Sequence, residues 1–141
     1  MTAGVRLLDG ESNQAVMVTE FKQLVVAPIA YSTPVQQVMD ATGTAFNFIV
    51  PVQGKSIVVT DVIVSANKSV SNTTPADITI YESDSASSLA NIETILQPQL
   101  TGASNLAITG LNLIIPKGVW VNATTDDATI LLTIMFYRVP V

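Results

Sequence analysis

The chain has 141 residues, of which 12% are charged, and it contains no histidine and no cysteine. Without these two residue types the chain lacks the usual general base, the thiolate nucleophile and most transition-metal ligands, so we do not expect an enzyme. The formal net charge of −5, with only six scattered basic residues, argues against a nucleic-acid partner.

The first 40 residues are predicted to form an extended arm with short strands. Strand-like pieces at residues 5–8, 15–18 and 24–26 are separated by turn residues and by Pro28 and Pro34. Such an arm can add strands to the open sheet edge of a neighbour. The alternative is that these pieces complete the domain's own sheets. In an arm, the expected interface residues are Leu7, Val16, Val18, Leu24, Val26, Pro28 and Tyr31.

Residues 41–141 are predicted to form one β domain. Residues 46–50 end at Pro51, and the β-branched residues 56–65 follow after a turn, which predicts a hairpin. Asp61 interrupts the apolar run, and we interpret it as a bulge or an edge position.

Further strands are predicted at residues 77–82, 92–96, 106–115, 118–122 and 129–138. In the last of these the apolar residues Ile130, Leu132, Ile134 and Phe136 alternate along one face. A helical turn competes only over residues 88–95. Strands joined by turns, without crossover helices, predict an all-β antiparallel β-sandwich. Long strands and broad loops favour a jelly roll over an immunoglobulin-like topology.

Acidic residues are the only catalytic groups left. Asp126 and Asp127 with Glu82, Asp84 and Glu93 are candidates for a glycosidase pair or a calcium site. Aspartate is also favoured in turns because its carboxylate accepts hydrogen bonds from local backbone amides. We therefore expect no catalytic residue, no metal site and no cofactor.

The single tryptophan, Trp120, raises a different binding class. An exposed aromatic ring on a sandwich can stack on a sugar, and loop residues such as Asn72 and Asp84 would assist. This alternative is a carbohydrate- or receptor-binding module. Packing of Trp120 in the core is the favoured interpretation of that residue.

The surface and the amino terminus bear on assembly and location. Few charges and many hydroxyl and amide side chains suit a surface that neighbours cover, so we expect a homo-oligomer. No apolar stretch approaches the roughly 20 residues that span a bilayer, and residues 1–5 lack the features of a signal peptide. Synthesis in a cytoplasm, with no membrane partner, is the expectation.

Three features of the sequence resemble those of a known class of protein. They are the predicted hairpin over residues 46–65, the strand 78–82, and residues 118–122 before a last strand that ends in Tyr137 and Arg138. In these features, over about the last two thirds of the chain, the sequence resembles small structural proteins of tailed bacteriophage virions, above all capsid decoration or cement proteins with a jelly-roll fold. The resemblance implies a homotrimer on the virion, made in the host cytoplasm, that clamps the major capsid protein lattice. The sugar- or receptor-binding alternative would place the same fold on a phage tail or fibre.

Overall fold

The computed structural model describes residues 7–8, 15–16, 32–66, 74–102, 104–127 and 129–140. The chain divides into two compact units, Met1–Tyr31 and Ser32–Val141. In the first unit, strands β1 (Leu7–Leu8) and β2 (Ala15–Val16) pair antiparallel, with Leu7 opposite Val16. This hairpin is a separate two-stranded sheet.

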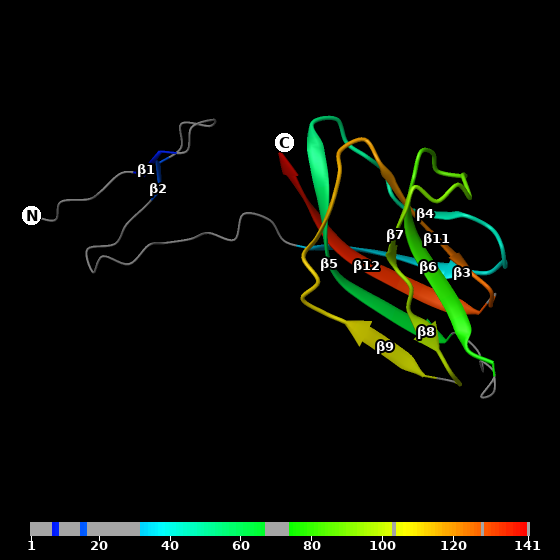
Figure 1. The fold of residues 1–141 in the computed structure, drawn as a ribbon. Coiled ribbons are helices and arrows are strands. Elements are labelled where there is room, and N and C mark those ends of the chain that lie inside the picture. Colours follow the sequence, from blue (N-terminus) through cyan, green and yellow to red (C-terminus); the bar gives the residue numbers. More distant parts are fainter. Residues whose placement is uncertain are drawn as a thin grey trace, which may run out of the picture. The chain divides into compact units, whose positions relative to one another are not determined.

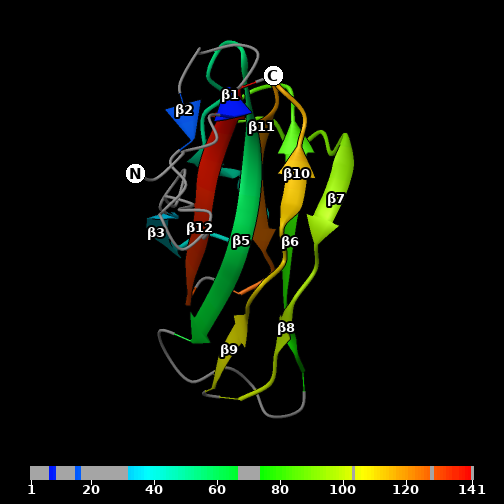
Figure 2. The same ribbon diagram turned by 90° about the vertical axis from the view of Figure 1, so that its left-hand side faces the viewer.

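The second unit consists of two antiparallel sheets (Figure 1). One sheet contains β3 (Thr33–Met39), β12 (Ile130–Pro140), β5 (Lys55–Ala66), β10 (Leu113–Ile115) and β9 (Asn105–Ile108). The other contains β4 (Phe46–Ile49), β11 (Trp120–Thr125), β6 (Ala76–Ser83), β7 (Glu93–Leu96) and β8 (Gln99–Leu100). Figure 2 shows β3, β12 and β5 side by side in the first sheet.

The strand pairing is nested along the chain. β3 pairs with β12, β4 with β11, β5 with β10 and β6 with β7. This is the pairing of one long antiparallel ribbon folded into two sheets, which is the jelly-roll arrangement. The described residues form no helix, and none of their segments is a helix able to span a membrane. The predicted all-β sandwich of jelly-roll type is confirmed.

Side-chain alternation builds the core between the sheets. Along β12, the side chains of Ile130, Leu132, Ile134 and Phe136 are buried, as predicted, while the residues between them are partly exposed. Because successive side chains of a strand point to opposite faces, one face of each sheet is apolar and packs on the other sheet. The core continues through the other strands with Val59, Val62, Val64, Ile78, Ile80, Ile115, Val121 and Ala123.

The predicted hairpin over residues 46–65 is wrong. β4 lies in the sheet of β11, whereas β5 lies in the sheet of β12, so the connection through Pro51 and Gly54 crosses between sheets. A turn signal between two apolar strands does not reveal whether the strands pair or face each other. The helical turn that competed over residues 88–95 is also absent, and β7 begins at Glu93.

β3 falls within the range 1–40 that the sequence assigns to an arm. All seven residues of β3 pair with β12, and the first compact unit ends at Tyr31. β3 is the edge strand of its sheet. This edge position accommodates Pro34, which has no backbone N–H to donate.

Of the two interpretations of Asp61, a bulge or an edge, the structure shows a bulge, at the adjacent residue Thr60. Asp61 is opposite Met135 and Val59 is opposite Phe136, which leaves Thr60 as an extra residue in β5. On the other side of β5, the Asp61 carboxylate accepts a hydrogen bond from the Gly110 backbone N–H at 3.1 Å. Gly110 has φ of 68°, a conformation that favours glycine, and this interruption divides the predicted strand 106–115 into β9 and β10.

Candidate functional site

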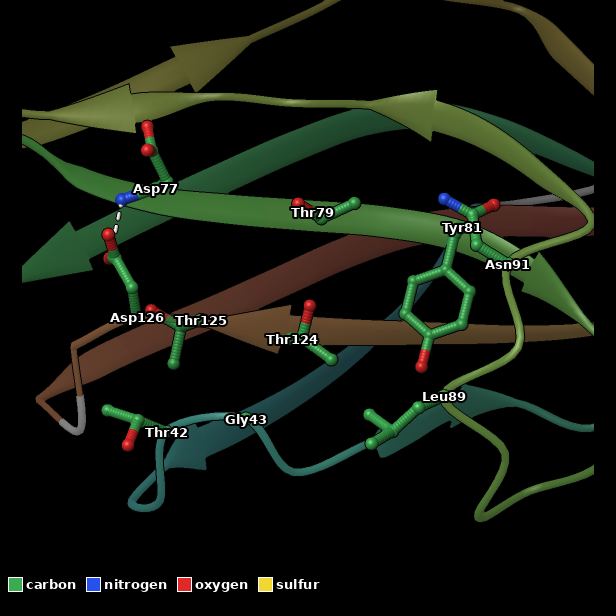
Figure 3. Close-up of a pocket in the computed structure, with 10 residues that line it drawn as sticks. All are labelled: Thr42, Gly43, Asp77, Thr79, Tyr81, Leu89, Asn91, Thr124, Thr125 and Asp126. Atoms are coloured by element: carbon green, nitrogen blue, oxygen red, sulfur yellow. Dashed lines mark hydrogen bonds between the residues drawn. The ribbon is translucent and has the colours of Figure 1, made fainter.

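A groove of about 630 Å³ lies on the outer face of the sheet containing β6 and β11. Figure 3 shows Asp77, Thr79 and Tyr81 in order along β6, with Thr124 and Asp126 beside them on β11 and its following turn. The loop after β3 and the loop before β7 form the other walls. The described residues that line the groove are Thr42, Gly43, Asp77, Thr79, Tyr81, Leu89, Asn91, Thr124, Thr125 and Asp126.

Antiparallel register brings the central polar residues together. Thr79 and Thr124 are directly opposite each other across β6 and β11, and both are partly exposed. Residues directly opposite on one face have Cβ atoms about 4.5–5.5 Å apart. The two hydroxyl groups therefore form one polar strip in the middle of the groove (Figure 3).

The acidic end of the groove is fixed by backbone hydrogen bonds. The Asp126 carboxylate accepts from the Asp77 backbone N–H at 2.7 Å, and the Asp126 N–H donates to the Asp77 carbonyl at 3.2 Å. The Asp77 carboxylate in turn accepts a hydrogen bond from the Gln99 side-chain amide. Both carboxylates thus have defined positions at the groove's surface.

The opposite end depends on a buried polar network. Asn122 is 0% exposed, and its side-chain N–H₂ donates to the Ser85 carbonyl at 2.9 Å and to the Ser88 carbonyl at 3.3 Å. The Asn122 oxygen accepts from the Asn47 side-chain amide at 2.9 Å. Tyr81 also donates its hydroxyl to the Ser88 carbonyl, at 2.8 Å. These bonds hold the loop that carries Leu89 and Asn91 against the sheet.

Burial raises the pKa of the Tyr81 hydroxyl, and the hydrogen bond with Asn122 opposes this shift in part. Tyr81 therefore remains a neutral donor at physiological pH. The described lining residues include two carboxylates but no lysine or arginine, so their field favours neutral or cationic groups.

A second cavity, of about 130 Å³, lies between β7 and β10, in opposite sheets. It is lined by Glu82, Glu93 and mainly aliphatic residues. Glu82 and Glu93 are cross-strand partners in β6 and β7, and Glu82 is only 7% exposed. Burial raises the pKa of the Glu82 carboxyl, and the charge of Glu93 raises it further.

We expect Glu82→Gln to be more stable than the wild type at pH 7. Because the pKa of Glu82 is raised on folding, the folded state binds the proton more tightly, and the charged carboxylate costs stability as pH rises above its ordinary value of 4.5. Burial and the opposing Glu93 charge both act on the carboxylate, so we expect a gain in unfolding free energy on the order of 1 kcal/mol. Urea titrations at several pH values measure it.

Glu93→Gln is the matched control because it removes only the neighbouring charge and leaves Glu82 buried. We expect Glu93→Gln to give the smaller gain, and the stability difference between Glu82→Gln and the wild type to close as pH falls below 4.5, where the Glu82 carboxyl becomes protonated in both states. A pH-independent difference between Glu82→Gln and wild type would contradict this account.

The acidic residues singled out in the sequence separate into distinct places. Asp127 acts in a turn, where its carboxylate accepts from the Thr129 backbone N–H at 2.9 Å. Asp126 lies at the groove, Glu82 and Glu93 lie at the second cavity, and Asp84 is exposed. In the described part of the chain, no three acidic, histidine or cysteine side chains converge as a metal site.

Of the predicted interface residues, only two lie in described strands. Leu7 and Val16 are register partners in the β1–β2 hairpin. The others lie outside the described residues: Val18, Leu24, Val26, Pro28 and Tyr31.

The sugar-binding residues suggested by the sequence do not define the groove. Trp120 begins β11, is partly buried and is not among the groove's lining residues. It is also outside the buried core cluster, so its predicted core packing is not observed. Asn72 lies outside the described residues.

Sequence reasoning missed Thr79, Thr124, Asp77 and Asn122 as site residues. The alternation in residues 77–82 places Asp77, Thr79 and Tyr81 on one face, and this was the available signal. Their pairing with β11 is non-local and has no counterpart in the local pattern.

Comparison with known proteins gives no identification. No family model matches the chain, and no curated protein matches it.

Proposed function

We propose that this protein is a structural, non-enzymatic virion protein, a capsid decoration (cement) protein that binds the head of a tailed bacteriophage as a homotrimer. Its partner in this proposal is the major capsid protein, and its place is the virion surface after synthesis in the host cytoplasm. Jelly rolls are used in viral capsid proteins, although a fold alone does not select a function.

The observation that carries the proposal is the division of the chain into two compact units. The described strands of both jelly-roll sheets lie between Thr33 and Pro140. The β1–β2 hairpin belongs to a separate compact unit, Met1–Tyr31. The strands described within residues 1–31, β1 and β2, thus belong to a sheet of their own, and we assign this unit to attachment.

The surface of the sandwich supports a role in assembly. Ile114 on the edge strand β10 is 74% exposed, and Ile92, just before the edge strand β7, is 61% exposed. Large apolar side chains and open strand edges are features that protein neighbours cover. Three joined subunits would bind a repeating shell with avidity exceeding a single contact by roughly 10²- to 10⁴-fold.

Capsid binding tests the proposal directly. We expect the full chain, mixed with expanded heads of its phage that lack it, to co-sediment with them and to saturate at a fixed ratio to the major capsid protein. Sedimentation velocity of the free protein is expected to show a trimer. Heads that pellet without the protein at saturating concentration would contradict the proposal, and a monomer would contradict the trimer.

A further inference from the structure

We propose that the groove along β6 and β11 is a binding site for a neutral carbohydrate. This goes beyond capsid attachment, since it assigns a ligand to a surface of the sandwich that the attachment role does not use.

The groove has the size and the polar groups that a saccharide requires. Its volume of about 630 Å³ lies within the roughly 300–1,000 Å³ typical of small-molecule sites. Thr79 and Thr124 offer hydroxyls that both donate and accept hydrogen bonds, and Asp77 and Asp126 offer carboxylates that only accept. Sugar hydroxyls are both donors and acceptors, so this set matches them.

The charge of the lining selects among carbohydrates. Among the described residues that line the groove there are two carboxylates and no lysine or arginine, and the whole chain has a net charge of −5. Uronates, sialic acids and phosphates would be repelled by this field. A neutral saccharide can instead donate its hydroxyl protons to Asp77 and Asp126 in charge-assisted hydrogen bonds.

The site is ordered before any ligand arrives. Asp126 is held by the Asp77 backbone N–H at 2.7 Å, and the loop of Leu89 and Asn91 is held by Asn122 and Tyr81. Positions fixed in advance reduce the entropy lost on binding. Leu89 is exposed at the end away from the carboxylates, where it can contact the C–H face of a sugar ring.

Binding of the full chain to neutral oligosaccharides, acidic oligosaccharides and a polyamine, followed by titration calorimetry on the best neutral ligand, tests the proposal. Thr124→Val removes one hydroxyl with little change of shape, and we expect about a 2- to 10-fold loss of affinity. Asp126→Asn keeps an oxygen for the Asp77 N–H but removes the charge, and we expect a loss of about 10-fold or more. Thr133→Val, on the other sheet, is the matched control and should bind like wild type.

Thermal unfolding of each variant shows that it is folded, and capsid co-sedimentation should be unchanged in all three. That result separates failure of the groove from failure of the attachment proposal. Failure of every neutral glycan to bind at millimolar concentration would overturn the inference, and so would binding of acidic glycans only or of a polyamine but no sugar. Wild-type affinity in both Thr124→Val and Asp126→Asn would also overturn it.

Discussion

Leu132→Ala should lower the free energy of unfolding by about 2–5 kcal/mol, the range for truncating a buried leucine. Leu132 is 0% exposed and lies in the core between the two sheets. The truncation removes apolar contacts and leaves a cavity that close-packed neighbours fill only in part. Urea denaturation followed by circular dichroism measures the change.

Leu131→Ala is the matched control, because it makes the same chemical change one residue earlier in the same strand. Leu131 is partly exposed on the opposite face of β12, so we expect a loss below about 1 kcal/mol. Equal losses for the two variants would contradict the assignment of Leu132 to the core and of Leu131 to the outer face.

Asn122→Asp should cost about 3–5 kcal/mol at pH 7, the range for leaving a buried charge uncompensated. The change is nearly isosteric, but the new carboxylate would face the Ser85 and Ser88 carbonyls, which now accept hydrogen bonds from the Asn122 amide. Two acceptors then oppose an anion in a position that water does not reach. The loop that contains Ser85 and Ser88 should also lose its hydrogen bonds to residue 122.

The pH dependence of Asn122→Asp gives a sharper test than its stability at one pH. Burial without a cation raises the pKa of the new carboxyl in the folded state, so the variant should regain stability relative to wild type as pH falls and the protonated acid can donate. Asn105→Asp, at an exposed position, should change stability by no more than about 0.5 kcal/mol. A deficit in Asn122→Asp that is constant from pH 7 to pH 4 would exclude the proposed charge effect.

The local sequence pattern was sufficient to predict features that depend only on neighbouring residues within one strand. The alternation of Ile130, Leu132, Ile134 and Phe136 predicted which side of β12 is buried, and the polar residue Asp61 in an apolar run predicted the bulge. Both signals come from the chemistry of adjacent residues. The crossing from β4 to β5 could not be predicted in this way, because both a hairpin and a crossing place a turn between two apolar strands.

The groove could not be predicted because its residues meet through pairing across about 45 positions of sequence. Thr79 and Thr124 are unremarkable in their own strands and form a strip only in the register of β6 with β11. Asn122 likewise gains its role from Ser85 and Ser88, in the loop between β6 and β7, and from Asn47 in β4. Trp120 was a candidate because of its residue type alone, whereas the groove depends on the pairing of β6 with β11.

Deletion of residues 1–31 tests the central claim most directly, since that claim separates a self-sufficient jelly roll from an attachment segment. The truncated protein begins at Ser32 and keeps all the described strands of both sandwich sheets. We expect a β-type circular dichroism spectrum with cooperative thermal unfolding, together with loss of co-sedimentation with heads that bind the full chain. A folded truncated protein that still saturates the heads, or a chain that no longer folds without residues 1–31, would contradict the account.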